Sequence, residues 1–217
     1  MNGTRWIAAT AVAAALIFAG AATVASAGDG DSGAGSGAAA PATDSADAGF
    51  ARDMSVHHQQ AVEMSFIVRD RTENEEIRRL AYDIINTQAN QRGMMLGWLD
   101  QWGLTPVAPE REPMAWMSGS DAHDGHTAKT GDVRMPGMAT PEQLEKLGAL
   151  RGKAAEVEYL RLMTAHHKGG VDMAQGCVDL CSPGAQRQLA EGMVQGQRSE
   201  LDLMADLLKE RGARPPS

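Results

Sequence analysis

The chain has 217 residues, of which 43% are hydrophobic and 22% are charged, as is usual for a soluble protein of about one domain. Its net charge of −8 makes it a poor candidate for nucleic-acid binding, which needs clustered Lys and Arg. Its aromatic content of 4% leaves few rings for stacking on bases or sugars, and two cysteines are too few for a disulfide-built fold or a four-thiolate zinc site. The unusual count is that of methionine, at 13.

Residues 1–27 have the pattern of a signal peptide. Arg5 supplies a short positive region, residues 6–22 are apolar and rich in alanine, and Ala-Ser-Ala at 25–27 offers a small-x-small cleavage site. The alternative is an uncleaved membrane anchor, because the apolar stretch approaches the ~20 residues that span a bilayer. In both cases the working part of the chain is expected outside the cytoplasm, either secreted, periplasmic or associated with the cell envelope.

Residues 28–47 consist mainly of Gly, Ala, Ser and Asp and contain almost nothing to bury. This composition predicts a flexible tether, because burial cannot offset the entropy lost on ordering such a segment. The folded domain is therefore expected to span residues 48–215.

An internal repeat with an offset of 109 residues relates the two halves of this domain. Residues 50–106 align with residues 159–215 without a gap, and 15 of the 57 aligned positions are identical. Both halves contain the motif Met-x-x-His-His. This identity predicts the same local structure in the two halves.

Each half is predicted to form a helical hairpin. In the first half, the capping box Thr72-x-x-Glu75 indicates the start of a helix that ends at a Gly103 cap. In the second half, Thr140 followed by proline opens one long helix, Ser182 followed by proline opens the next, and Gly212 closes it.

Strand signals are absent, since the chain has no sustained period-two alternation and no Asn-Gly hairpin turn. Four helices in two tandem hairpins, each with one apolar stripe, predict an all-α fold, a four-helix bundle. Residues 104–139 form its long connection.

Two stripes of side chains are predicted on the inward faces of the first and third helices. Spacings of 4, 3, 4 and 3 residues place all members of a stripe on one helix face, and His58 and His167 flank the stripes. Imidazole nitrogen with thioether sulfur suits Cu(I), and Cu(II) is a further candidate. The stripes are Phe50, Met54, His57, Ala61 and Met64, and Tyr159, Met163, His166, Gly170 and Met173. The candidate metal ligands are Met54, His57, His58, Met64, Met163, His166, His167 and Met173.

Polar residues interrupt the apolar stripes of the second and fourth helices. Because a ligating imidazole usually donates a hydrogen bond from its other nitrogen, these residues are candidates for orienting the histidines. They are Gln88, Gln91, Gln197 and Glu200. The alternative is a core without metal, in which His–Gln hydrogen bonds across the bundle account for both kinds of residue and methionine only fills space.

The connection contains three further pairs of soft-metal ligands at the same spacing. Core packing is not expected in a loop rich in Gly, Asp and Pro, and a long connection is usually either functional or disordered. The pairs therefore indicate an auxiliary soft-metal clamp, or else a disordered linker that happens to hold methionine. The residues are Met114, Met117, His123, His126, Met135 and Met138.

Cys177 and Cys181 are not part of the repeat. Cys177 lies about 16 Å along the helix from His166, too far to share a ligand sphere. An ideal helix holds residues four apart too far from each other for a relaxed disulfide, but Ser182 and the following proline end the helix there. A local disulfide is therefore favoured over a thiolate copper site in an oxidising compartment.

The chain resembles the family known as domain of unknown function 305. The resemblance covers residues 48–215 and rests on MSVHHQQAVEM, MTAHHKGGVDM and the connecting stretch MPGMATPEQLEKL. It implies a ferritin-like fold, export, and kinship with CopM-like periplasmic copper-binding proteins, with His57, His58, His166 and His167 as the positions carried over. The family often has proline before the first histidine of each pair, where this chain has Val56 and Ala165.

Three functions are compatible with these observations. The first is an extracytoplasmic protein that binds or handles copper without turnover, for homeostasis or resistance, and that exchanges the ion with another copper-handling protein. The second is a structural or interaction bundle without metal. The third is a ferritin-like metalloenzyme, which is disfavoured because no Glu or Asp lies three residues before any of the six histidines.

Overall fold

The computed structural model describes residues 39–118, 135–214 and 216. The predicted signal peptide, most of the predicted tether, and His123 and His126 lie outside the described residues. Within them, no helix is long and apolar enough to cross a membrane.

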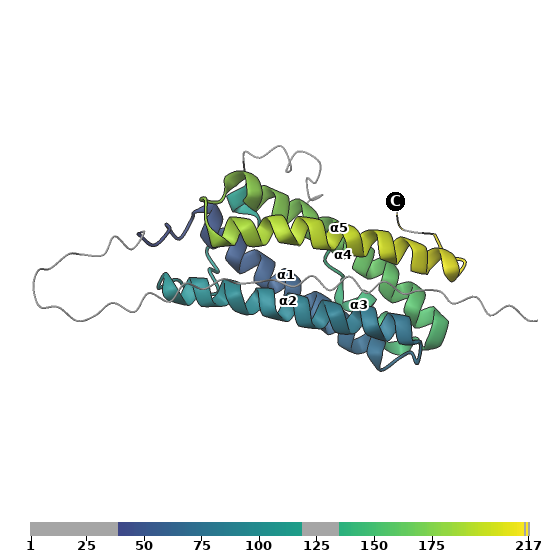
Figure 1. The fold of residues 1–217 in the computed structure, drawn as a ribbon. Coiled ribbons are helices and arrows are strands. Elements are labelled where there is room, and N and C mark those ends of the chain that lie inside the picture. The colour runs from purple at the N-terminus through teal and green to yellow at the C-terminus, as the bar shows by residue number, and fades with distance from the viewer. Residues whose placement is uncertain (1–38, 119–134, 215, 217) are drawn as a thin grey trace, which may run out of the picture. The chain divides into compact units, whose positions relative to one another are not determined.

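The described residues form five α-helices and one 3-10 turn, without strands, in agreement with the predicted all-α class. Helix α1 packs against α2, α4 packs against α5, and the two hairpins meet through α1 and α4 (Figure 1). The short α3 contacts both α1 and α4. The elements are α1 (Ala46–Arg69), α2 (Glu75–Gln101), the 3-10 turn (Ala115–Met117), α3 (Pro141–Ala149), α4 (Gly152–Leu180) and α5 (Ala185–Glu210).

The ordered domain begins before the predicted boundary at residue 48. Ser45 is the N-cap of α1, with its side chain accepting from the Ala48 amide, and Asp47 is buried. Arg52 anchors the preceding segment by donating to the Thr43 carbonyl. The prediction of a tether reaching residue 47 is therefore wrong at its C-terminal end.

Two predicted helix starts are wrong by two residues or more. Asn74, not Thr72, caps α2, because its side chain accepts from the Ile77 amide, while the Thr72 hydroxyl accepts from the Asn74 amide and donates to Glu156. Gly184 precedes α5 in place of Ser182, whose amide and hydroxyl both donate to Asp47.

The long helix predicted from Thr140 is two helices. The capping box is present, with Thr140 and Gln143 bonded reciprocally, but α3 ends at Ala149. Gly152 then has a φ of +54°, which favours glycine, and its amide donates to the Arg71 carbonyl at 2.7 Å. This contact with the turn between α1 and α2 fixes the break. The predicted ends at Gly103 and Gly212 are confirmed, since both glycines follow their helices with positive φ.

The buried hydrophobic side chains form two clusters. One cluster contains Met64 and Met163 among aliphatic side chains from α1, α2, α4 and α5. The other, which we name the methionine-rich core, contains aromatic and aliphatic side chains together with Met54, Met95, Met114, Met117, Met135, Met173 and Met193. The expectation that the connection's methionines lie outside the core is therefore wrong for Met114, Met117 and Met135.

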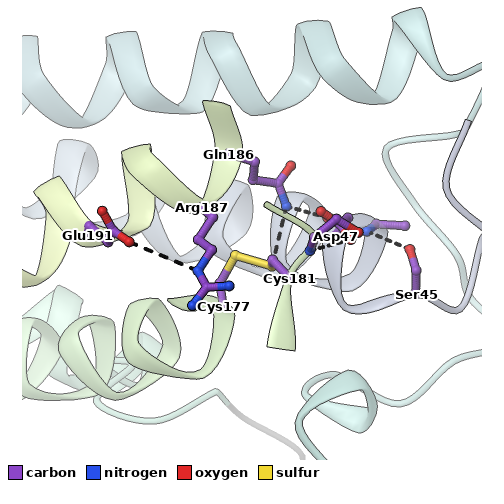
Figure 2. The surroundings of a disulfide bond; sticks show 9 residues. Ser45, Asp47, Cys177, Cys181, Gln186, Arg187 and Glu191 are labelled. Carbon is purple, nitrogen blue, oxygen red and sulfur yellow. Dashed lines mark hydrogen bonds and ion pairs between the residues drawn. A yellow bond between two sulfur atoms is a disulfide. The ribbon is translucent and has the colours of Figure 1, made fainter. Parts of the chain in front are cut away.

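The predicted disulfide between Cys177 and Cys181 is present in the methionine-rich core (Figure 2). Cys181 is the C-cap of α4 and has extended backbone angles, so the bond forms where the helix ends. Beside it, the Asp47 carbonyl accepts from Gln186, which ties α1 to the start of α5.

Candidate metal centre

The two repeats meet at a pair of stacked histidines. The rings of His57 in α1 and His166 in α4 have centroids 3.7 Å apart and planes inclined by 30°, and neither side chain is exposed. The packing is antiparallel, because the start of α1 shares a core with the end of α4. The prediction that the repeat brings the two stripes together is thus met at their histidines.

The second histidine of each motif is also fully buried and contacts its own hairpin. His58 Nε2 lies 2.8 Å from Gln91 Oε1 in α2. His167 Nε2 lies 2.6 Å from Glu200 Oε2 in α5. Because residues 91 and 200 are equivalent in the repeat, the two hairpins use the same contact.

All four histidines face an oxygen acceptor with Nε2. His57 Nε2 lies 3.0 Å from the Pro136 carbonyl, and His166 Nε2 lies 2.9 Å from the His57 carbonyl. Main-chain carbonyl oxygens can only accept, so the neutral rings of His57 and His166 carry their proton on Nε2 and keep a lone pair on Nδ1. All four Nδ1 atoms are buried and have no hydrogen-bond partner. This is the arrangement of imidazoles prepared to ligate, with the second nitrogen already oriented by an oxygen.

Burial also keeps the rings of His57, His58 and His166 neutral. It lowers the pKa of His57 to about 4 and that of His58 to about 3, because a charged imidazole would lose its hydration there. Burial, followed by the neighbouring His57, lowers the pKa of His166 well below its usual value. The Nδ1 lone pairs of these three rings are therefore available at neutral pH.

The four predicted methionine ligands are all buried, but they belong to two different clusters. Met54 and Met173 belong to the methionine-rich core, whereas Met64 and Met163 belong to the other cluster. The eight candidate ligands are therefore not gathered at one point.

The four predicted orienting residues divide into two kinds. Gln91 and Glu200 make the expected contacts with His58 and His167. Gln88 and Gln197 are buried, but Gln88 Oε1 and both polar atoms of Gln197 have no partner, so the structure does not show them orienting a histidine. A Cβ on Gly170 would lie 2.3 Å from Gln197 Oε1, so the end of the Gln197 side chain packs directly against this glycine.

The sequence interpretation missed the acceptor for His57. The Pro136 carbonyl belongs to the connection, and the adjacent backbone at Ala139 is bonded in both directions by the Gln60 side chain. The only feature of the sequence that pointed to this segment was the Met-Pro-Gly-Met stretch. It was part of the family resemblance, but the sequence alone gave it no structural role. Of the predicted clamp residues in the connection, Met138 is partly buried against the methionine-rich core that includes Met135.

The ligand chemistry of this centre favours a soft ion. Among the described residues, no three His, Cys, Asp or Glu side chains are placed to hold a metal together. Imidazole nitrogen and thioether sulfur, the two kinds of ligand that the stripes supply, match the preference of Cu(I).

A tandem pair of helical hairpins that meet at two His-His motifs defines the class of this protein. The chain belongs to the DUF305 family, domain of unknown function, whose model matches residues 47–208. No curated protein matches the chain.

Solved structures share this fold. A DUF305 protein from Streptomyces coelicolor that is described as secreted is 61% identical, with a TM-score of 0.72, and the match covers 81% of this chain and 99% of that one. A DUF305 fragment from Deinococcus radiodurans is 29% identical, with a TM-score of 0.60 over 76% and 96% of the two chains. CopM in its Cu(I)-bound form is 22% identical, with a TM-score of 0.55 over 76% and 96% of the two chains.

Proposed function

We propose that the protein binds copper outside the cytoplasm, as Cu(I) in the first place, and passes or buffers the ion without turnover. The observation that carries the proposal is the set of four buried Nδ1 atoms without partners, each on a ring whose Nε2 already faces an oxygen. An unpaired buried polar atom costs about 1–3 kcal/mol, and an ion that binds these four atoms would offset that cost.

The similar proteins support this proposal. CopM has been crystallised with Cu(I), with Cu(II) and with silver, and it has the same fold. The protein from Streptomyces coelicolor is described as secreted, which agrees with the signal pattern of residues 1–27. A copper-handling protein that gives or takes the ion is the expected partner.

The test is an anaerobic Cu(I) titration of residues 28–217 against a chromogenic competitor. The main variant is His57→Gln/His166→Gln, because glutamine can still donate to the two carbonyls but has no ring nitrogen. We expect at least a tenfold loss of Cu(I) affinity in this variant. An unchanged affinity would remove the histidine pair from the site.

Matched variants assign the remaining ligands. Met54→Leu/Met173→Leu and Met64→Leu/Met163→Leu each remove the candidate thioether ligands of one cluster at nearly constant volume. The cluster that coordinates copper is the cluster whose variant loses affinity. His123→Asn/His126→Asn tests the connection, and a loss confined to that variant would move the site there.

A structural bundle without metal is the second candidate, and the hydrogen bonds and close stacking of the two rings favour it. In that case His57→Gln/His166→Gln lowers the free energy of unfolding but leaves every copper measurement unchanged. Failure of the intact protein to compete for Cu(I) at all would select this function.

A further inference from the structure

We propose that the segment 135–139, which we name the strap, holds His57 in its ligating form and controls access to it, so that His57 is the releasable ligand of the pair. The second part of this inference rests on the proposed function. The strap is the Met-Pro-Gly-Met-Ala stretch of the connection, which the sequence alone could not explain.

Two glycines allow the backbone of the strap to pack closely against helix α4. A Cβ on Gly169 would lie 2.0 Å from the Pro136 carbonyl oxygen, and a Cβ on Gly137 would lie 2.2 Å from the Ala165 carbonyl oxygen. Only glycine at both positions allows this approach of backbone to backbone. Gly137 also has a φ of +76°, which favours glycine for a second reason.

Gln60 holds the other end of the strap through two hydrogen bonds. Its Nε2 donates to the Ala139 carbonyl at 3.0 Å, and its Oε1 accepts from the Ala139 amide at 2.7 Å. Gln60 lies three residues after His57, so one face of α1 presents both the ring and the residue that positions its acceptor. Gln60 is thus a positioning residue that acts on His57 through the strap.

The strap breaks the symmetry of the repeat at the stacked rings. His166 donates to the backbone of α1, at the His57 carbonyl, which cannot move without the helix. His57 donates instead to Pro136 in the strap, although the equivalent partner would be a carbonyl of α4. Because the connection occurs once, only one histidine of the pair is held by a segment outside the helices.

A cavity borders the strap and helix α4. It has a volume of about 420 Å³ and is lined by Pro136, Gly137, Ala165, Lys168, Gly169 and Asp172, among others. Displacement of the strap toward this cavity would release the His57 proton donor and open the buried ring to solvent. Entry and exit of a metal ion are therefore expected on this side.

Two variants lift the strap without touching either histidine. Gly169→Ala forces the Pro136 carbonyl outward, and Gly97→Ala is its control, because a Cβ at this helical glycine meets nothing within 4 Å. Gln60→Leu removes the two hydrogen bonds to Ala139, and Gln59→Leu is its control at an exposed position of the same helix.

The first readout uses the metal-free protein. Nitrogen-15 NMR of the imidazoles should show His57 as the Nε2–H form in the parent and the two controls, and a mixture of forms in Gly169→Ala and Gln60→Leu. Hydrogen exchange at the Ala139 amide should be at least tenfold faster in the strap variants. Unchanged tautomer and exchange would overturn the inference whether or not the protein binds copper.

The second readout uses the Cu(I)-loaded protein. Stopped-flow transfer to an excess of chelator should be at least tenfold faster in both strap variants than in their controls. Altered NMR and exchange together with unchanged transfer would overturn the gating role while leaving copper binding intact. If the parent binds no Cu(I), the proposed function fails, and the metal-free readout alone then decides whether the strap holds His57.

Discussion

Mild acid should unfold the metal-free protein, because its buried histidines resist protonation. Above a pH of about 6.5 the imidazoles of His57, His58 and His166 are neutral in both states, and none of them changes stability. Below this pH the unfolded chain binds protons that the folded chain does not bind, since burial lowers these three pKa values. Stability is therefore present above pH 6.5 and is lost as the pH falls toward the folded pKa values.

The size of this loss follows from the linkage relation. At pH 5 His57 and His58 each cost about 2 kcal/mol, because the unfolded form is then mostly charged and the folded form is not. Together these two cost about 4 kcal/mol, a large part of the stability of many domains, and His166 adds to the loss in the same direction. Urea titrations followed by circular dichroism, at several pH values between 7.5 and 5 with a chelator present, measure the loss.

One variant and one control sharpen this prediction. His58→Gln removes one of the three buried titrating groups and should reduce the loss of stability at pH 5 by about 2 kcal/mol. Gln59→His adds an imidazole at an exposed position, where the pKa should be the same in both states, and should change nothing. A free energy of unfolding that differs by less than about 1 kcal/mol between pH 7.5 and pH 5 would refute the reasoning.

Two further predictions concern stability. Replacing Cys177 and Cys181 by serine, or reducing their disulfide, should cost about 2 kcal/mol by the loop-entropy relation for so short a loop, measured as a lower midpoint of thermal unfolding; no change on reduction would contradict it. Glu156→Gln should cost about 3–5 kcal/mol in urea titrations, because it leaves the buried Arg211 guanidinium, 2.7 Å from the carboxylate, without its counter-charge; a cost under about 1 kcal/mol would show that the pair is solvated.

Hydrophobic periodicity and the internal repeat were sufficient to predict which faces of the helices are buried. Every member of both stripes is buried, and the stacking of His57 on His166 follows from two equal hairpins that pack through equal faces. Such a pattern can be recognised in a single helix, and the repeat shows it twice. It agrees with the folded structure because the apolar face of each helix is the face that packs against its neighbours.

The helix starts were harder to predict, since they depend on competition between neighbouring residues for the same backbone groups. Thr72 and Ser182 have side chains that can cap a helix, but each is bonded to a distant carboxylate instead, Glu156 in one case and Asp47 in the other. The break before Gly152 likewise depends on a contact with the Arg71 carbonyl. No local rule contains these long-range partners.

The strap could not be predicted because its role depends on the path of the backbone. The connection was expected to lie away from the core, yet Met114, Met117 and Met135 fill the methionine-rich core. The acceptor for His57 is a main-chain carbonyl, and every residue has one, so no side-chain pattern marks Pro136. Gly137 and Gly169 are the residues that come closest to marking the strap in the sequence. Their role can be recognised only in the structure, where the two segments are in contact.

Two buried polar clusters in this fold differ in how far their hydrogen bonds are completed. Around Glu156, both carboxylate oxygens are used, one by Thr72 and the other by Arg211, and the cluster joins the ends of α1, α4 and α5. Around the histidines, each ring uses one nitrogen and leaves the other buried without a partner. A cluster that only stabilised the bundle would gain from completing these bonds, as the Glu156 cluster does. The unpaired nitrogens instead lower the stability of the metal-free protein and leave lone pairs that a bound cation could use. The expected loss of stability in acid and the proposed affinity for copper therefore have the same cause, which is the burial of imidazoles with one nitrogen left unpaired.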